Sequence, residues 1–323
     1  MQRLVTGIQP SGKPHLGNYL GVMKNQIAYQ NDFDCYYFLA NLHALTTIKN
    51  GEELNRLTID LVLDYLAIGL DPQKVTFFKQ SDVPEHTELA WILATVTPHG
   101  LLERAHAYKD AVASGKKEAT VGLFTYPVLM AADILMYKPD LVPVGKDQKQ
   151  HIEITRDIAE KFNHNYGETF PLPEAEINED TAVVPGIDGQ KMSKSYNNTI
   201  PLFAEPKELK AQVMKIETDS TPLEAPKDPD KCLVYQLYKL LATTDQTATM
   251  ANNLKAGGYG YGHAKTDLYN LLHEQFEPLR QKRIELSKDI DYINDILNTG
   301  AKKARMIAQQ TMTEVRHKVG TKI

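Results

Sequence analysis

A glycine-rich stretch near the N-terminus, Gly7–Gly21 (GIQPSGKPHLGNYLG), constrains the fold of this chain more than any other feature. It follows the apolar run Leu4-Val5-Thr6 and leads into a segment that we predict to be helical. Glycine has no Cβ, so the glycines let the backbone turn tightly and approach a ligand closely. A strand, a glycine-rich turn and a helix N-terminus together favour the binding of a phosphate group. The alternative is an ordinary strand-to-helix loop with a surface histidine, His15.

Length and composition favour a globular protein of one large domain or two. The chain has 323 residues, 42% hydrophobic and 24% charged, which is enough for a sizeable core. Its formal net charge of −5 argues against a protein that coats nucleic acid through charge alone. Cys35 and Cys232 show neither metal-ligand spacing nor a disulfide framework. No apolar run approaches the roughly 20 residues of a membrane span, and no signal-peptide pattern is present, so we expect a cytoplasmic protein.

The first half alternates short apolar runs with segments of helical period. Four runs are predicted to be strands: Leu4–Ile8, Cys35–Ala40, Val75–Phe78 and Leu141–Gly145. Between the second and third, Glu52–Leu70 carries apolar residues at the 3.6-residue spacing of a helix. This alternation implies an α/β fold whose parallel sheet is covered on both faces. Ligands bind outside the C-terminal ends of such strands, so Gly7–Asn18, Asn41–His43 and Gln80-Ser81 should gather at one edge.

A single carboxylate lies inside the apolar helical segment Thr125–Tyr137. The charge of Asp133 must be compensated there, by another group of the protein or by a ligand, because an uncompensated buried charge costs several kcal/mol. It is either part of a structural hydrogen bond or salt bridge, or an acceptor for a ligand's N–H group. Asp147 and Gln148 follow the last predicted strand and should stand at the mouth of the sheet, although Asp147 is equally well explained as a helix N-cap.

Two lysines and two serines fall within five residues at Lys191–Ser195 (KMSKS), followed by Asn197-Asn198. A flexible cationic loop of this kind suits a polyanion such as a triphosphate, whose negative charge has to be stabilised as a bond to phosphorus breaks. An ordinary solvated face is the alternative.

Together these stretches resemble one family. His15-Leu16-Gly17-Asn18 is a variant of the HIGH signature and Lys191–Ser195 is an intact KMSKS signature, in the order found in class I aminoacyl-tRNA synthetases. The segments GIQPSGKPHLGNYLG, YPVLMAADILMY and VPVGKDQKQHIEITRDIA resemble the bacterial-type tryptophanyl-tRNA synthetases in particular. The resemblance covers nearly the whole chain, including its C-terminal helices.

The resemblance implies a Rossmann-like parallel-sheet catalytic domain at residues 1–195, with a mobile insertion at about 105–122, and an all-α tRNA anticodon-binding domain at 196–323. It implies a tryptophan–tRNA ligase. Such an enzyme joins L-tryptophan and ATP to tryptophanyl-adenylate and pyrophosphate, then transfers tryptophan to the 3′ end of tRNA(Trp). ATP is a substrate that brings Mg²⁺, no structural metal is expected, and family members are homodimers.

The resemblance also assigns roles to particular residues. Asp133 would accept the indole N–H, so a tyrosine or phenylalanine substrate would leave it unpaired. The other residues implied for L-tryptophan are Gly7, Met130, Val142 and Val144 along the indole, Gln9, Tyr126 and Gln148 at the amino-acid ammonium and carboxylate, and His43. The residues implied as catalytic are His15, Asn18, Lys191 and Lys194. The residues implied for ATP are Gln9, Pro10, Ser11, Gly17, Asn18, Gly145, Lys146, Asp147, Val183 or Val184, Lys191, Met192, Ser193, Lys194 and Ser195.

The chain departs from the family pattern in four places. Asn41-Leu42-His43 replaces the commoner Asp-Gln-His or Asp-Asn-His, so the surroundings of the indole pocket are expected to differ. Ala111 leaves Lys109 as the lysine of the predicted insertion that can reach ATP. Val5 stands where phenylalanine is frequent, which leaves more room beside the substrate. Lys146 replaces the commoner glutamate and adds a positive charge near the nucleotide.

The second half is predicted to be helical. The predicted helices are Pro206–Ile216, Cys232–Ala242, Thr247–Ala256, Lys265–Leu297 and Gly300–Lys318. From Ala301 onward the sequence contains one acidic residue, Glu314, and an excess of basic residues: Lys302, Lys303, Arg305, Arg316, Lys318 and Lys322. Such a surface would orient tRNA through its phosphates. A solvated face that suits the helix dipole is the alternative.

Other functions fit parts of the pattern. A tyrosyl-tRNA synthetase shares both signatures but is disfavoured by AADIL and GIQPSG. Another HIGH-type nucleotidyltransferase would have no use for the helical second half. A catalytically silent RNA-binding paralogue need not keep the KMSKS lysines or Asp133.

The single tryptophan, Trp91, is predicted to lie in the core or at a subunit contact.

Overall fold

The computed structural model describes residues 1–105, 120–145, 148–177 and 184–322. At its centre is a five-stranded sheet in the order β3-β2-β1-β4-β5, in which all neighbouring strands are parallel. The strands are β1 (Arg3–Ile8), β2 (Asp34–Leu39), β3 (Val75–Lys79), β4 (Leu141–Val144) and β5 (Glu174–Ile177). The predicted α/β class with a Rossmann-like sheet is therefore confirmed. The strand order reverses between β1 and β4, which is where such sheets bind ligands.

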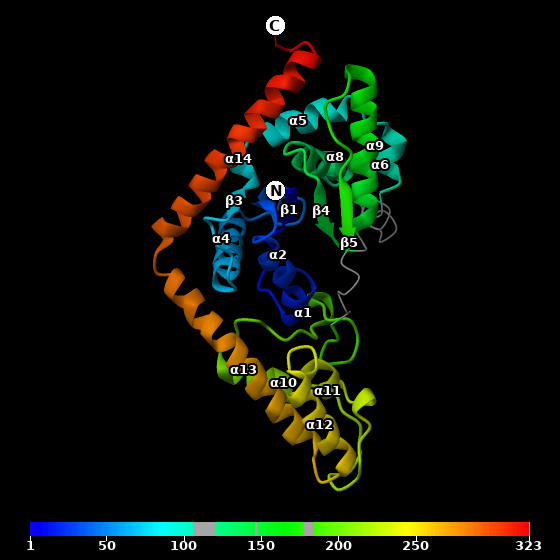
Figure 1. Cartoon of the computed structure of the whole chain (residues 1–323), viewed down its shortest axis with the longest axis vertical. Helices are drawn as coiled ribbons and strands as arrows, with labels where there is room; N and C mark the ends of the chain where they lie inside the picture. Colours follow the sequence, from blue (N-terminus) through cyan, green and yellow to red (C-terminus); the bar gives the residue numbers. More distant parts are fainter. Residues whose placement is uncertain (106–119, 146–147, 178–183, 323) are drawn as a thin grey trace.

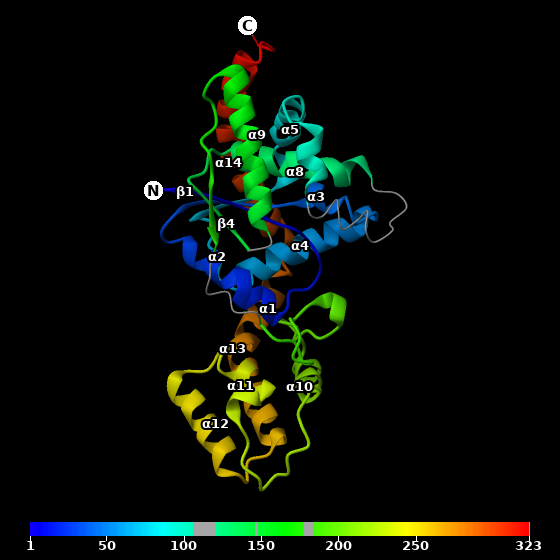
Figure 2. The same cartoon turned by 90° about the vertical axis from the view of Figure 1, so that its right-hand side faces the viewer.

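Helices flank the sheet and continue into a second, helical lobe, drawn below the sheet in Figures 1 and 2. Around the sheet lie α1 (Leu16–Asn18), α2 (Lys24–Tyr29), α3 (Asn41–Ala44), α4 (Gly51–Ala67), η2 (Gln80–Asp82), α5 (Glu85–Ala94), α6 (His99–Glu103), α8 (Val121–Leu135) and α9 (Lys149–Tyr166). The helical lobe contains α10 (Pro206–Met214), α11 (Leu233–Tyr238), α12 (Thr244–Ala256) and α13 (Tyr261–Leu286). The last helix, α14 (Ile290–Lys318), runs back along the sheet domain.

Successive residues of β2 point to opposite faces of the sheet, as the period of a strand requires. Tyr36 and Phe38 pack into one apolar core with residues of α5, α8 and α9. Cys35 and Tyr37 pack into a second core with residues of α4. Both faces are thus covered by helices, which explains why the strand is apolar along its whole length.

Helix α14 crosses the edge of the sheet at β3 and contributes to both cores. Ile293 and Leu297 belong to the core on the α4 side, and Ala304 and Met312 to the core on the α5 side. Between them, Gly300 lies so close to β3 that an added Cβ would stand 1.9 Å from the carbonyl oxygen of Phe77. The helix therefore needs glycine at this position, although glycine in a helix interior costs about 1 kcal/mol relative to alanine.

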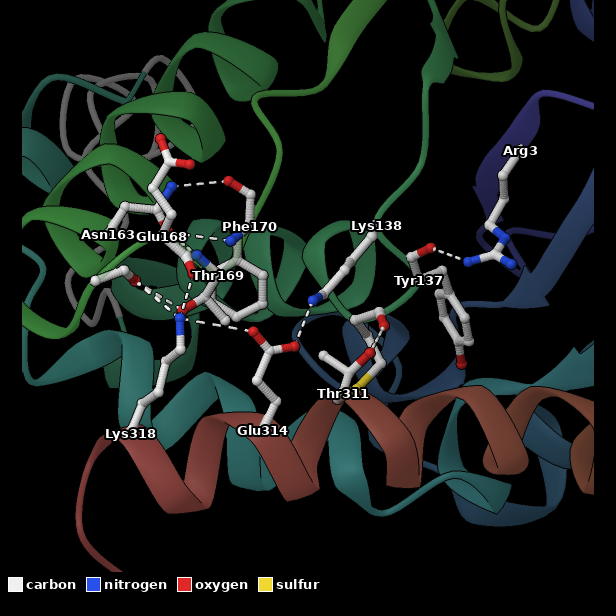
Figure 3. A network of polar contacts seen from close by, with 12 residues as sticks. Arg3, Tyr137, Lys138, Asn163, Glu168, Thr169, Phe170, Thr311, Glu314 and Lys318 are labelled. Atoms are coloured by element: carbon white, nitrogen blue, oxygen red, sulfur yellow. Dashed lines mark hydrogen bonds and ion pairs between the residues drawn. The ribbon is translucent and has the colours of Figure 1, made fainter.

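The end of α14 is fixed to the sheet domain by polar contacts (Figure 3). The Thr311 hydroxyl donates to the carbonyl of Met136 at 2.8 Å. Lys138 Nζ forms an ion pair with Glu314 at 2.7 Å, and Lys318 donates to the carbonyl oxygen of Glu168. A helix at the end of the sequence is therefore packed against the first half of the chain.

The basic surplus of α14 is partly neutralised within the chain. Arg305 donates to Glu85 of α5 at 2.9 Å, and Arg316 donates to Glu88 at 2.7 Å. The hydrogen bond from Arg316 lowers the pKa of Glu88. Two of the residues predicted to form an open phosphate-binding surface thus hold α14 against α5 instead. Lys302 and Lys303 are exposed.

The helical lobe is joined to the sheet domain near α4. On α13, Arg283 donates to Asp64 at 2.5 Å and to Asp60 at 2.7 Å. Leu16 and Met192, one from each signature, are buried in the same apolar core as α10–α13. The two signatures therefore lie between the lobes.

Two parts of the predicted secondary structure were wrong. Strand β5 was not predicted, because Glu174-Ala175-Glu176-Ile177 is short and polar, as an edge strand can be. A helix break was expected before Gly300, but the break lies after Leu286 and α14 continues through the glycine. Asp289 caps the new helix by accepting from the backbone N–H of Tyr292 at 2.9 Å.

Among the residues that the structure describes, no helix is long and apolar enough to cross a membrane. The predicted insertion bearing Lys109 and Ala111 lies mostly outside the described residues.

We expect Gly300→Ala to lower the free energy of unfolding by about 2–4 kcal/mol, because the new methyl group overlaps the Phe77 carbonyl and the helix has to move away from β3. Gly262→Ala in α13 is the matched control, since its Cβ would meet nothing within 4 Å, and it should be neutral or slightly stabilising. Denaturant unfolding of both variants measures the difference. Equal stability of the two variants would contradict the close packing of α14 on β3.

Candidate active site

A cavity of about 530 Å³ opens at the C-terminal edge of the sheet. Its volume suits a ligand the size of an amino acid with part of a nucleotide. Its lining includes every residue that the sequence implied for tryptophan: Gly7, Gln9, His43, Tyr126, Met130, Asp133, Val142, Val144 and Gln148. Gly145, from the residues implied for ATP, lines it as well. Strands β1 and β4 and helices α3 and α8 thus bring distant parts of the sequence to one place.

Glycine at position 7 is required by the packing of the cavity floor. A Cβ on Gly7 would stand 2.6 Å from the ring of Phe38 on the neighbouring strand β2. Val142 on β4 and Met130 on α8 give the cavity apolar walls. A flat apolar ligand could therefore lie against this floor, with its polar groups directed to the few polar side chains of the lining.

Asp133 is completely buried and its carboxylate accepts hydrogen bonds from three side chains. His43 Nε2 lies 2.7 Å from Oδ2, and His86 Nδ1 lies 2.5 Å from Oδ1. Gln80 Nε2 lies 2.8 Å and 2.9 Å from the two oxygens. Burial alone would raise the pKa of Asp133, but the hydrogen bonds and charges of His43 and His86 outweigh it and lower that pKa. The cavity therefore contains an ionised acceptor.

Sequence reasoning placed Gln80 at this edge of the sheet but gave it no role, and it did not single out His86. Gln80 follows directly after β3 in η2, and His86 is the second residue of α5. For Gln80, its position directly after a strand was the sequence feature that could have indicated a role in the site. No sequence feature indicated His86, since only the fold brings the start of α5 against α8. His43, from the departure Asn41-Leu42-His43, is in direct contact with Asp133.

A second polar pair lies on another side of the cavity. The Tyr126 hydroxyl and His151 Nε2 are 2.8 Å apart, and burial raises the pKa of Tyr126 to about 12. Tyr126 therefore stays protonated at neutral pH and can donate or accept a hydrogen bond. His151 was not among the predicted residues, although it lines the cavity.

The two signatures contact each other through the segment that follows Gln9, which itself lines the cavity. The backbone N–H of Gly17 lies 3.3 Å from Met192 Sδ, and Lys194 Nζ donates to the carbonyl of Ser11 at 3.0 Å. The backbone N–H of Leu16 also donates to the backbone carbonyl of Ile200, beyond the second signature, at 2.9 Å. A glycine-rich turn at the start of a helix and a cationic loop thus face each other, which is an arrangement suited to a phosphate chain.

Comparison with known proteins identifies this combination. The family described as tRNA synthetases class I (W and Y) matches residues 1–277. The tryptophan–tRNA ligase of Fusobacterium nucleatum is 56% identical over 99% of this chain and 98% of its own length. That of Rhodopirellula baltica is 52% identical over 98% and 99%. The crystal structure of tryptophanyl-tRNA synthetase from Campylobacter jejuni complexed with ADP and tryptophane superposes with a TM-score of 0.95, at 49% identity, covering 98% of this chain and 99% of that one.

The chain belongs to the class I aminoacyl-tRNA synthetases, as a bacterial-type tryptophan–tRNA ligase. The predicted family, fold and enzyme class are confirmed. The Campylobacter structure also confirms that a close relative binds a nucleotide together with tryptophan.

The HIGH-type signature of this synthetase holds a neutral histidine. Burial, and then the charge of Lys194, lower the pKa of His15 to about 4. His15 Nδ1 accepts from the backbone N–H of Asn18 at 3.3 Å, and Asn18 Oδ1 accepts from the backbone N–H of His15 at 3.1 Å. This reciprocal capping leaves Nε2 of the neutral ring as the N–H donor. Partial desolvation by the neighbouring turn lowers the pKa of Lys194, although its side chain keeps exposed surface, and the charge of Asp64 opposes this shift.

The KMSKS loop is braced from behind by Asn198, which sequence reasoning did not assign. Its buried side chain donates to Asp188 Oδ1 at 2.8 Å and to the carbonyl of Lys191 at 3.1 Å, and accepts from the backbone N–H of Ser193 at 2.8 Å. Gly186 lies directly against this amide, because a Cβ there would stand 2.3 Å from Asn198 Nδ2. The loop therefore has a fixed backbone on its buried side.

The remaining residues implied for ATP lie in different surroundings. Lys191, Lys194 and Ser195 are exposed, whereas Met192 is buried in the core of the helical lobe. Pro10 and Ser11 lie in the turn after β1. Lys146, Asp147 and Val183 lie outside the described residues, while Val184 is buried.

We expect Asn198→Ala to lower the free energy of unfolding by about 2–3 kcal/mol, because the buried Asn198 amide is lost and partly buried groups of Asp188, Lys191 and Ser193 lose their partner. Asn197→Gly is the control, since Asn197 is exposed and has a φ of 52° that glycine adopts freely. Thermal and denaturant unfolding report the difference. If Asn198→Ala is as stable as the control, Asn198 does not brace the loop.

Proposed function

We propose that the chain activates L-tryptophan with ATP to tryptophanyl-adenylate and pyrophosphate, then transfers tryptophan to the 3′ end of tRNA(Trp). The observation that carries this proposal is the buried Asp133, held by three side-chain donors at the wall of an apolar cavity.

Asp133 accepts the indole N–H and selects the amino acid. An ionised carboxylate that faces an apolar slot penalises a side chain without a donor at that position, because the charge is left unpaired. Gly7, Met130, Val142 and Val144 lie along the indole. Gln9, Tyr126 and Gln148 hold the ammonium and carboxylate of the amino acid. His43 keeps its contact with Asp133 at 2.7 Å.

The reaction requires no nucleophilic side chain. The tryptophan carboxylate attacks the α-phosphorus of ATP, and pyrophosphate leaves with the bonding electrons. Gly17 and Asn18 bind the nucleotide at the start of α1, and Asp147 would hold its ribose. Lys191, Lys194 and neutral His15 stabilise the charge that develops on the phosphates. Catalysis is therefore positioning and electrostatic stabilisation.

Mg²⁺ would enter as part of the substrate. Within the described part of the chain, no three His, Cys, Asp or Glu side chains are grouped so that they could hold a metal ion. We therefore assign the ion to the ATP phosphates and derive no step through it.

The helical second half binds tRNA, and residues 196–323 include the anticodon-binding region. Exposed lysines of α14, Lys302 and Lys303, are candidates for phosphate contacts. Arg305 and Arg316 are not, because they pair with Glu85 and Glu88. We place the enzyme in the cytoplasm, in keeping with its two free cysteines.

The enzyme is proposed to be a homodimer with Trp91 in the subunit contact. Trp91 on α5 is 73% exposed, so it is not the core residue that the sequence allowed. A large exposed aromatic side chain is typical of a protein interface.

Pyrophosphate exchange tests the function and the role of Lys194 together. We expect exchange with tryptophan and much less with tyrosine or phenylalanine. Lys194→Ala should slow adenylate formation by about 100- to 1000-fold while the Kd for tryptophan stays nearly unchanged. Lys207→Ala, an exposed lysine on α10, is the control. Equal losses in tryptophan binding and adenylate formation would show that Lys194 does not act on the phosphates. Preferred exchange with tyrosine, or none at all, would overturn the function.

Fluorescence tests the subunit contact directly, because Trp91 is the single tryptophan of the chain. We expect its emission to shift to longer wavelength on dilution, in step with dimer dissociation measured by sedimentation. Trp91→Ser should weaken the dimer, whereas Leu223→Ser, at an exposed residue in the helical lobe, should not. A dimer whose Trp91 emission is that of a solvated indole at every concentration would place the interface elsewhere.

A further inference from the structure

The side of Asp133 that faces away from the cavity is occupied by two side chains, Gln80 and His86. Both have no exposed surface. Neither lines the cavity, whereas Asp133 and His43 do. The carboxylate is therefore held from behind by groups that a bound amino acid does not touch.

The directions of these hydrogen bonds follow from the acceptor. An ionised carboxylate can only accept, so His86 presents an N–H at Nδ1. The other ring nitrogen, Nε2, lies 2.7 Å from the Tyr137 hydroxyl, which can either donate or accept. Tyr137 is itself buried and stacks on Tyr36. Tyr137 therefore holds the His86 ring with Nδ1 directed at Asp133.

Gln80 is oriented in the same way. Its amide nitrogen contacts both oxygens of Asp133, while its carbonyl oxygen accepts from the backbone N–H of Leu42 at 3.1 Å. Leu42 precedes His43 in α3. One amide thus orients Asp133 and also anchors the helix that places His43 at the cavity.

We propose that His86 and Gln80 are positioning residues for amino-acid specificity. They hold the Asp133 carboxylate ionised and turned so that an oxygen faces the cavity. This inference rests on the proposed role of Asp133 as acceptor of the indole N–H. It extends the specificity determinant to two residues that make no contact with the substrate.

The physical consequence is a change in discrimination. Without the N–H of His86, a fully buried carboxylate loses a charge-assisted hydrogen bond and is more readily protonated. A neutral carboxyl group pairs less strongly with an indole N–H. It also penalises phenylalanine less, because no charge is then left unpaired. Both effects reduce the preference for tryptophan over phenylalanine.

Two isosteric substitutions separate the contacts of His86. His86→Asn keeps an amide nitrogen near the position of Nδ1, so it retains a donor for Asp133 and loses Tyr137. His86→Gln keeps a polar group near the position of Nε2, so it retains Tyr137 and loses Asp133. The measurement is kcat and KM for tryptophan and for phenylalanine in pyrophosphate exchange, per active site as titrated by the adenylate burst.

We expect His86→Gln to lower the ratio of kcat/KM for tryptophan to that for phenylalanine by about 10- to 100-fold, as for the loss of one hydrogen bond to a charged group. The loss should appear in KM for tryptophan and leave KM for ATP unchanged. His86→Asn should keep most of the ratio. A merely structural role would lower the melting temperature and the fraction of active sites in both variants without changing the ratio.

An unchanged ratio in His86→Gln, or an equal loss in both variants, overturns the proposal. Asp133→Asn distinguishes this from failure of the proposed function. If Asp133→Asn abolishes the preference for tryptophan and His86→Gln does not, Asp133 selects the substrate without help from His86. If Asp133→Asn also keeps the preference, the role of Asp133 itself is wrong.

Discussion

A carboxylate without solvent contact joins four segments of this chain at one point. Asp133 is carried by α8, and its partners come from α3, η2 and α5. Leaving that charge unpaired would cost several kcal/mol, a large fraction of the stability of a domain. The three donors must therefore assemble for the sheet domain to fold with Asp133 ionised. The same assembly places an acceptor at the wall of the cavity, so folding and the proposed selection of the substrate depend on one interaction.

The nucleotide side of the site is organised by backbone contacts instead. The backbone N–H of Leu16 donates to the carbonyl of Ile200, and the Lys194 side chain donates to the backbone carbonyl of Ser11, so segments distant in sequence are joined. Such contacts fix the separation of the two signatures while leaving side chains such as Lys191 at the surface. This division suits the chemistry, because a phosphate chain is bound by backbone N–H groups and mobile cations, whereas an indole needs a rigid slot.

Much of this arrangement could be predicted from the sequence. Buried parallel strands are continuous apolar runs, so β1, β2, β3 and β4 were evident, and the position of Gly7, His43 and Gln80 at strand ends predicted that they gather at one edge of the sheet. What escaped prediction depends on contacts between distant residues. Strand β5 is polar because it lies at an edge, and the N-cap at Asp289 outweighed Gly300 as a helix boundary. The partners of Arg305, Arg316 and Asp133 are set by how helices pack, which no local pattern encodes.

Helix α14 and the helical lobe are attached to the sheet domain by different kinds of contact. α14 is embedded in both apolar cores of the sheet domain, and such extensive burial is costly to undo. The helical lobe is joined to the sheet domain by an apolar core that includes Leu16 and by Arg283, and burial raises the pKa of its partner Asp64 to about 6 despite that arginine. Desolvation thus offsets part of what the Arg283–Asp64 pair contributes. α14 is therefore attached mainly by apolar burial, whereas the attachment of the helical lobe includes an ion pair whose net contribution is reduced by desolvation.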